Sequence, residues 1–188
     1  MNFLLISGSF HSKSNSLALL KCIQPFFGDN KTETPRIDAL PFYSEDLNND
    51  KPQIVREFLS QVESADGLLF CTPEYNHSLP GVLKNAIDWA SRPAFKSPLK
   101  DMPVSIITQA GSPVGGARAQ AHLKLVLDST LSEIHKCHEM MIANINDVLD
   151  ESMQVRDTKV LNRLERHIHD FIGFAESKAN TPLPIGMP

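Results

Sequence analysis

The sequence lacks the features that mark several common classes of protein. Lys and Arg number 18 against 22 Asp and Glu, so there is no excess of positive charge for binding nucleic acid. The three cysteines, Cys22, Cys71 and Cys137, are widely spaced, which argues against a zinc site and a disulfide framework. The first apolar run, residues 3–6, is too short for a signal peptide or a membrane span. We therefore expect a soluble cytoplasmic protein that binds neither nucleic acid nor membrane.

Two widespread phosphate-binding motifs are also missing. No Gly-x-Gly-x-x-Gly follows the first apolar run, which excludes the dinucleotide fingerprint. No Gly-x-x-x-x-Gly-Lys-Ser/Thr occurs, so the chain has no P-loop. Internal repeats and low-complexity segments are absent as well. A phosphate site in this chain would therefore suit a monophosphate better than a pyrophosphate.

Short apolar runs with the character of strands recur along the chain. Three continuous runs, residues 3–6, 67–71 and 104–108, are typical of strands buried on both faces. Weaker runs predict two more strands, near Pro35 to Leu40 and near Glu139 to Ala143. Such strands belong to a parallel sheet if helices alternate with them.

Apolar residues at helical spacing do fill the gaps between these runs. The helical patterns cover Leu17 to Phe27, Ile54 to Ala65, Val82 to Trp89, Leu123 to Leu131 and Leu161 to Ala175. The alternation predicts an α/β fold with a parallel sheet covered by helices on both faces. We expect a single domain over residues 1–178 and an irregular C-terminal tail over residues 179–188.

The loop after the first strand, Gly8 to Ser16, is dense in hydroxyl groups. In parallel sheets, ligands bind beyond the carboxyl ends of the strands. A helix N-terminus offers unpaired N–H groups and a partial positive charge, and serine hydroxyls add donors without adding net charge. A serine-rich N-cap is the alternative, but one cap requires one such residue and this loop holds four serines and Asn15. The loop therefore predicts an anion site.

The loop after the second strong strand, Thr72 to Gly81, is stiffened by two prolines and a glycine. Amides near Tyr75 and Asn76 would suit a planar ring that forms hydrogen bonds. An ordinary strand-to-helix turn, with Pro80 and Gly81 setting the start of the helix, explains the same residues. Residue types alone leave both interpretations open.

The residues from Pro73 to Trp89 resemble a known family signature. They read Pro-Glu-Tyr-Asn-x-Ser-x-Pro-Gly-x-Leu-Lys-Asn-Ala-Ile-Asp-Trp, which is similar to the signature of the NADPH-dependent FMN reductase family. That family includes FMN, quinone, chromate and azo-dye reductases. Further matches are Gly8-Ser9 with Ser14-Asn15-Ser16, Leu40-Pro41-Phe42-Tyr43 with Asp46, and Gly115-Gly116-Ala117-Arg118. The resemblance extends from the first strand to about Leu131.

The resemblance implies a fold and a cofactor site. The fold would be a flavodoxin-like three-layer sandwich, with a five-stranded parallel sheet in the order 2-1-3-4-5 and helices on both faces. The FMN phosphate would contact Ser9, Ser14, Asn15 and Ser16. The isoalloxazine ring would be bordered by Pro73, Glu74, Tyr75 and Asn76. From the other side, the ring or the ribityl chain would be approached by Gln109, Ala110 and Gly111.

The first loop departs from the family in two ways: it is one residue shorter than the commonest version, and it differs at position 11. Many members have an arginine where this chain has His11. Histidine donates to a phosphate more strongly when it is protonated, but it lacks the fixed fork of arginine. We therefore include His11 among the cofactor-binding residues and expect weaker or pH-dependent FMN binding.

The resemblance further implies an FMN-dependent oxidoreductase. It would pass hydride from NADPH or NADH through FMN to a flavin, a quinone or a similar small acceptor, with no catalytic side chain required. Two alternatives remain on the same scaffold: an azo-compound or chromate reductase, and a flavodoxin-type electron carrier, although such carriers are more acidic than a net charge of −4. A flavin-free binding module is a third. We expect a homodimer or homotetramer that meets at Pro41 to Asp46 and Val82 to Ser91.

Several other residues have simpler interpretations. The string His135-Lys136-Cys137-His138-Glu139 suggests a metal cluster, but the sequence shows no matching ligands elsewhere, so we expect no metal site. His167 and His169 should point to different sides of the last helix. We expect Trp89 to be a packing or interface residue and not to stack on the flavin. Arg118 would bind a nicotinamide-nucleotide phosphate or a neighbouring subunit.

Overall fold

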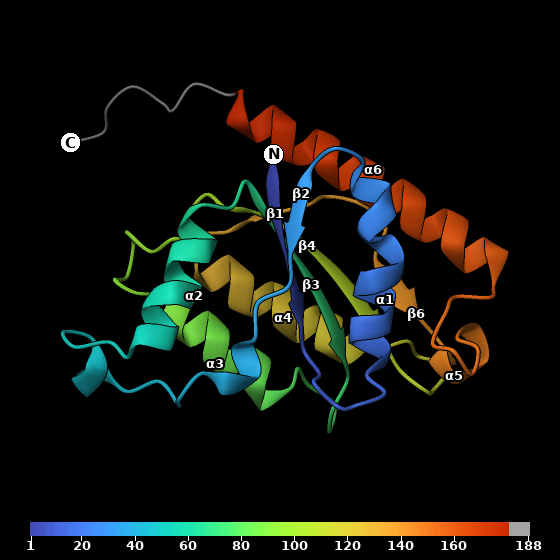
Figure 1. Ribbon diagram of the computed structural model, residues 1–188, viewed down its shortest axis with the longest axis horizontal. Coiled ribbons are helices and arrows are strands. Elements are labelled where there is room, and N and C mark those ends of the chain that lie inside the picture. The colour runs from blue at the N-terminus through green and yellow to red at the C-terminus, as the bar shows by residue number, and fades with distance from the viewer. Residues whose placement is uncertain (181–188) are drawn as a thin grey trace.

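The computed structural model describes residues 1–180, in which strands and helices alternate (Figure 1). The strands are β1 (Asn2–Ser7), β2 (Lys31–Glu33), β3 (Gly67–Pro73), β4 (Pro103–Gln109), β5 (Glu133–Ile134) and β6 (Met140–Ile142). The α-helices are α1 (Asn15–Ile23), α2 (Gln53–Glu63), α3 (Gly81–Ala90), α4 (Ala117–Ser129), α5 (Ile145–Val148) and α6 (Thr158–Ala179). Single 3₁₀ turns lie at Gln24–Phe27, Ile37–Ala39 and Glu45–Leu47. No helix within these 180 residues is long and apolar enough to cross a bilayer.

The strands form one parallel sheet in the order β2-β1-β3-β4-β5. The last position is shared, because β5 pairs with Pro103 and Val104 at the start of β4 and β6 pairs with Ile107 to Gln109 at its end. The predicted flavodoxin-like fold and its strand order are therefore confirmed. The fifth position holds two short strands in place of one, which gives six strands within residues 1–180.

Helices cover both faces of the sheet, as predicted, because successive side chains of a strand point to opposite faces. Leu4 and Ile6 of β1 join one core cluster with the apolar sides of α2, α3 and α4. Phe3 and Leu5 join the other cluster with α1, α5 and α6. Figure 1 shows α1 and α6 on one side of the sheet and α2 and α3 on the other. The result is a three-layer sandwich.

The segment from Pro35 to Leu40 is not the strand that we predicted. The strand next to β1 is β2, which ends at Glu33, and Ile37–Ala39 forms a 3₁₀ turn. Pro35 has no N–H group to donate to a strand ladder. The apolar residues that suggested a strand, Ile37 and Leu40, are buried in the cluster under α2 and α3.

The last helix extends slightly further than expected. Helix α6 ends at Ala179, and Asn180 closes its last turn. The predicted irregular tail over residues 179–188 therefore overlaps the helix at its first residue, and residues 181–188 lie outside the described part of the chain. His167 is buried on α6 and His169 is exposed, which confirms that they point to different sides.

Candidate functional site

A cavity of about 290 Å³ opens where β1, β3 and β4 end. Ten of the twelve residues predicted to bind a cofactor line it: Ser9, His11, Ser14, Asn15, Pro73, Glu74, Tyr75, Gln109, Ala110 and Gly111. The other two, Ser16 and Asn76, lie beside the cavity and not on its wall. Lys13 lines the cavity although its sequence context did not single it out. The structure thus brings the three predicted loops together at one edge of the sheet.

Hydrogen bonds hold the first loop in a tight path. The hydroxyls of Ser7 and Ser14 both donate to the carbonyl of Ser9, over 2.7 and 2.9 Å. The amide of Gly8 donates to the carbonyl of Cys71 at 2.8 Å, so this loop runs against β3. A Cβ atom on Gly8 would lie 2.1 Å from Oγ1 of Thr72. Glycine is therefore required at position 8.

The first loop delivers the N-terminus of α1 to the cavity. Ser14 caps this helix by accepting the amide of Leu17 at 3.2 Å. The amides of Asn15 and Ser16, in the first turn, have no acceptor within the helix. The first turn contains no acidic side chain. An uncompensated partial positive charge therefore faces the cavity from α1.

Two basic side chains stand beside this helix end. The Nδ1 atom of His11 accepts the amide of Lys13 at 3.1 Å, which leaves the hydrogen of a neutral ring on Nε2. Both residues are exposed and both line the cavity. A positively charged residue in a hydroxyl-rich loop is a signal that could have identified Lys13 from the sequence.

The second loop folds into a tight turn at the rim of the cavity. The amides of Tyr75 and Ser78 donate to each other's carbonyls, over 2.9 and 3.0 Å. The two residues between them, Asn76 and His77, have φ angles of 48° and 66°. The turn therefore uses the amide of Tyr75 internally. The Tyr75 hydroxyl lies 3.4 Å from Oγ of Ser9 and so links the first and second loops.

The third loop is fastened to its neighbours beneath the cavity. The side-chain amide of Gln109 donates to Oγ of Ser16 over 3.3 Å, and both residues are buried. The backbone amide of Glu74 donates to the carbonyl of Gln109 at 3.3 Å. The amide of Ala110 donates to Ile142 of β6. Ser16 therefore positions the third loop from within the fold.

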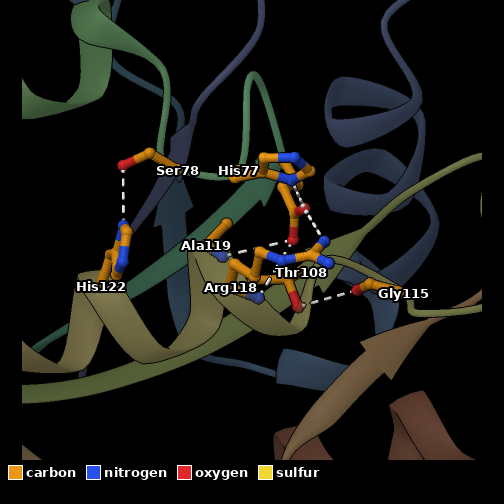
Figure 2. Close-up of polar contacts among 8 residues, drawn as sticks. His77, Ser78, Thr108, Gly115, Arg118, Ala119 and His122 are labelled. Carbon is orange, nitrogen blue, oxygen red and sulfur yellow. Dashed lines mark hydrogen bonds and ion pairs between the residues drawn. The ribbon is translucent and has the colours of Figure 1, made fainter.

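The carboxylate of Glu74 lies at the N-terminus of α4, against Arg118 and Ala119, which Figure 2 labels. It accepts the amides of these two residues, over 3.0 and 3.4 Å, and one guanidinium N–H of Arg118 at 2.9 Å. Burial raises the pKa of Glu74, but the hydrogen bonds from Arg118, His77 and Ala119 outweigh it and hold the pKa below its usual value. A side chain of the protein thus fills the anion site of α4.

Further contacts bind the second and third loops to α4. Oγ1 of Thr108 donates to the carbonyl of Gly115 at 3.0 Å, and a hydrogen bond of 3.0 Å joins Oγ of Ser78 to Nδ1 of His122 (Figure 2). Gly116, which caps α4, has a φ of 84°, a conformation that favours glycine. The sequence Gly115-Gly116-Ala117-Arg118 therefore forms the N-terminus of α4, to which the Glu74 carboxylate is hydrogen-bonded.

Trp89 is fully buried, and it packs in the fold as predicted. Its indole N–H donates to the carbonyl of Pro41 at 2.8 Å, and its ring meets Tyr43 edge-on at 5.1 Å. The side-chain amide of Asn85 donates to the same carbonyl at 3.0 Å. These contacts hold the Pro41 to Asp46 segment against α3. Phe42, between the two anchored residues, is left 86% exposed.

The fold and the cavity define a flavodoxin-like protein with an open helix N-terminus beyond the end of its first strand. Residues 1–147 match the family model of the NADPH-dependent FMN reductases. The chain is 38% identical to an NAD(P)H-dependent FMN reductase of Pseudomonas aeruginosa, over 87% of this chain and 89% of the relative. It is 36% identical to a quinone reductase of Escherichia coli, over 76% and 77%.

Among solved structures, the chain resembles the flavoenzyme NAD(P)H:(acceptor) oxidoreductase of Paracoccus denitrificans. The TM-score is 0.86 at 30% identity, and the match covers 94% of this chain and 98% of that one. The chain belongs to the NADPH-dependent FMN reductase family. The predicted family, the oxidoreductase class, and FMN with NAD(P)H as cofactors are thereby confirmed.

Proposed function

We propose that the cavity holds FMN with its phosphate at the N-terminus of α1, and that the reduced site delivers electrons to a quinone-type acceptor. The observation that carries this proposal is the convergence of three loops on one cavity, of which one loop offers an open helix N-terminus. The quinone reductase relative supports the class of acceptor.

The first loop would bind the phosphate through several kinds of donor. The free amides of Asn15 and Ser16, the hydroxyl of Ser9, the ammonium group of Lys13 and the imidazole of His11 lie at this end of the cavity. Ser14 keeps its hydroxyl engaged with Ser9 and Leu17, so its role is to shape the loop. The residues present therefore fit a dianionic monophosphate.

The second and third loops would border the ring on opposite sides. Pro73, Glu74 and Tyr75 line the cavity from the second loop, and Gln109, Ala110 and Gly111 line it from the third. Several of their amides are engaged in the fold, so these walls are rigid before any ligand arrives. Asn76 would contribute from the turn at the rim, and Ser16 through Gln109.

FMN, when bound, supplies hydride transfer between the nicotinamide donor and the acceptor. The protein's part is to hold the ring at the cavity mouth, where donor and acceptor enter in turn. Backbone donors around the ring would stabilise negative charge on the reduced cofactor. This scheme requires no acid, base or nucleophile from the chain.

We further propose a cytoplasmic homodimer or homotetramer. The exposed Phe42, held between Pro41 and Tyr43 against α3, supports an interface at Pro41 to Asp46 and Val82 to Ser91. Cys22, Cys71 and Cys137 are unpaired, which suits a reducing compartment. Light scattering should give two or four times the monomer mass, and Phe42→Ser should reduce it.

A spectrum of the purified protein and a turnover assay test the function. Flavin absorbance is expected, with NADPH and NADH oxidation faster in the presence of menadione than with free FMN, chromate or an azo dye. A flavin-loaded protein that oxidises neither nucleotide with a quinone would identify an electron carrier. A colourless protein that binds no added FMN would sink the proposal.

A further inference from the structure

A second cluster of functional side chains lies at the break between β5 and β6. His135 and Cys137 belong to this break, and His167 reaches them from α6. One ring nitrogen of each histidine and Sγ of Cys137 all lie within 4.8 Å of one another. The sequence alone shows the first two residues together; the fold supplies the third, thirty positions later.

Ser105 holds the two histidine rings in place. Its Oγ lies 3.1 Å from Nδ1 of His135 and 2.9 Å from Nε2 of His167, and both histidines are buried. The hydroxyl oxygen has two lone pairs, so it can accept an N–H group from each ring, which leaves the far nitrogen of each ring with a lone pair for a metal. Nδ1 of His167 is left facing Sγ of Cys137 at 3.8 Å. A hydrogen bond on the far side of an imidazole is how proteins orient metal-binding histidines.

The cluster is open to solvent on one side. Cys137 is exposed, and it lines a cavity of about 150 Å³ together with His167, Glu139 and Asp170. Asp170 follows His167 by three positions, so both face the same side of α6. A metal ion could reach the cluster by this route, and the Asp170 carboxylate or a water molecule could complete its coordination.

We propose that His135, Cys137 and His167 bind Zn²⁺. Imidazole and thiolate are the ligands that zinc prefers, and tetrahedral bonds to nitrogen and sulfur require ligand atoms roughly 3.3–3.8 Å apart. Side-chain shifts of about 1 Å would bring the three atoms to that spacing. The bound ion would fasten the segment 135–139 to α6, beyond the edge strand of the sheet.

The charges around the cluster are mixed. Arg163 and Arg166 also line the cavity, and they oppose a cation. The carboxylate of Asp170 offsets them, and Cys137 adds a negative charge when a metal ion displaces its proton; Glu139 is already paired with Lys124. None of these residues lines the cavity at the ends of β1, β3 and β4, so the zinc site does not rest on the proposed flavin function.

Cobalt is the probe for the test, because thiolate-bound Co²⁺ has a charge-transfer band that a site without sulfur lacks. The protein with its flavin bound is treated with a chelator, kept reduced and titrated with Co²⁺, then with Zn²⁺ as competitor, and difference spectra are recorded. One ion per chain and a thiolate band that Zn²⁺ abolishes are expected. Absence of the band, or less than one ion per chain, overturns the proposal.

Two matched pairs of variants locate the ion. Cys137→Ser should remove the thiolate band and lower Zn²⁺ affinity by at least about 100-fold. Mutations of residues that only support metal ligands cost up to about 100-fold, so loss of a ligand should cost at least that much. The control Cys22→Ser should change neither the band nor the affinity. His167→Asn should weaken binding, and His169→Asn, on the exposed side of α6, should not. Because Cys137 is exposed, Cys137→Ser should fold even if His167→Asn does not. Wild-type affinity in Cys137→Ser overturns the proposal.

Discussion

Helices α1 and α4 begin at the same edge of the sheet, yet their N-termini are completed in different ways. At α4, Glu74 places a carboxylate on the amides of Arg118 and Ala119. At α1, the Ser14 hydroxyl satisfies the amide of Leu17 and leaves those of Asn15 and Ser16 directed at the cavity. One positive helix end is neutralised by the protein itself, and the other is available to a ligand.

This difference leaves one open helix N-terminus beside the cavity, which suits the single phosphate group of the FMN that we propose. A second open helix N-terminus on the same cavity would compete for the same anion. Glu74 removes that competition, and it also ties the loop after β3 to α4 through Arg118. Arg118, for which the sequence left two roles open, therefore forms an ion pair with Glu74 of its own chain.

The most damaging change should be Gly8→Ala, in the loop that leads to α1. The new Cβ would collide with Thr72, whose own hydroxyl donates to the carbonyl of Pro73. We expect a loss of about 1–3 kcal/mol in the free energy of unfolding, and loss of stoichiometric FMN binding. Denaturant melts and FMN titration measure both. Gly173→Ala, where nothing lies within 4 Å of the new atom, is the control and should be neutral or slightly stabilising.

Ser14→Ala should show whether the first loop binds phosphate or only caps α1. It removes the cap of α1 and the bond to Ser9, so we expect a loss of about 1 kcal/mol in stability and roughly tenfold weaker FMN binding. Asp157→Ala removes the equivalent cap of α6. It should cost similar stability without changing FMN affinity. Equal FMN affinity in the two variants would contradict a phosphate site at α1.

Glu74→Gln should remove the negative charge that neutralises the N-terminus of α4. Removing the charge should cost about 1 kcal/mol of stability at pH 7. Because the folded-state pKa of Glu74 is lowered, its stabilising effect is present above its unfolded-state pKa and is lost as pH falls through the folded-state value. Urea melts of wild type and Glu74→Gln should therefore converge as pH falls below about 4.3, the ordinary pKa of glutamate. A constant difference between them down to pH 3 would be inconsistent with this account.

The smallest effect should come from His11. A charged imidazole donates to phosphate more strongly than a neutral one, so FMN should bind roughly a few-fold more tightly at pH 6 than at pH 8. His11→Arg should bind more tightly still and with less dependence on pH, because its charge is permanent. Fluorescence titration of FMN across this range provides the measurement. The same affinity at both pH values would argue against a phosphate contact.

The sequence predicted the strongly apolar parts of the fold well. Continuous runs such as residues 67–71 can only be buried, and they formed β3 and β4 as expected. The weak edge positions were not predictable in detail. β2 and β5 contain three and two residues, none of them fully buried, so no apolar pattern marks them. Ile37 and Leu40 did show an apolar pattern, but they are buried in the core from a 3₁₀ turn and the residue after it, not from a strand.

The candidate site was predictable where loops leave strong strands, because parallel strands bring their carboxyl ends to one edge. Long-range pairings were not. Nothing in the sequence links Glu74 to α4, forty-four positions away, or Gln109 to Ser16. For His167, the sequence predicted only the side of the helix to which it points. Its contact with Cys137 depends on how α6 packs on the sheet, which the sequence does not show.

The sheet has two outer edges, and both are poor templates for another strand. At one edge β2 offers three residues; at the other, the interruption at residues 135–139 leaves two short ladders out of step with each other. Strand-to-strand addition requires an uninterrupted row of free backbone groups. Copies of this chain would therefore associate through side chains on helices and loops, which protects the folded protein from growing into extended β-aggregates.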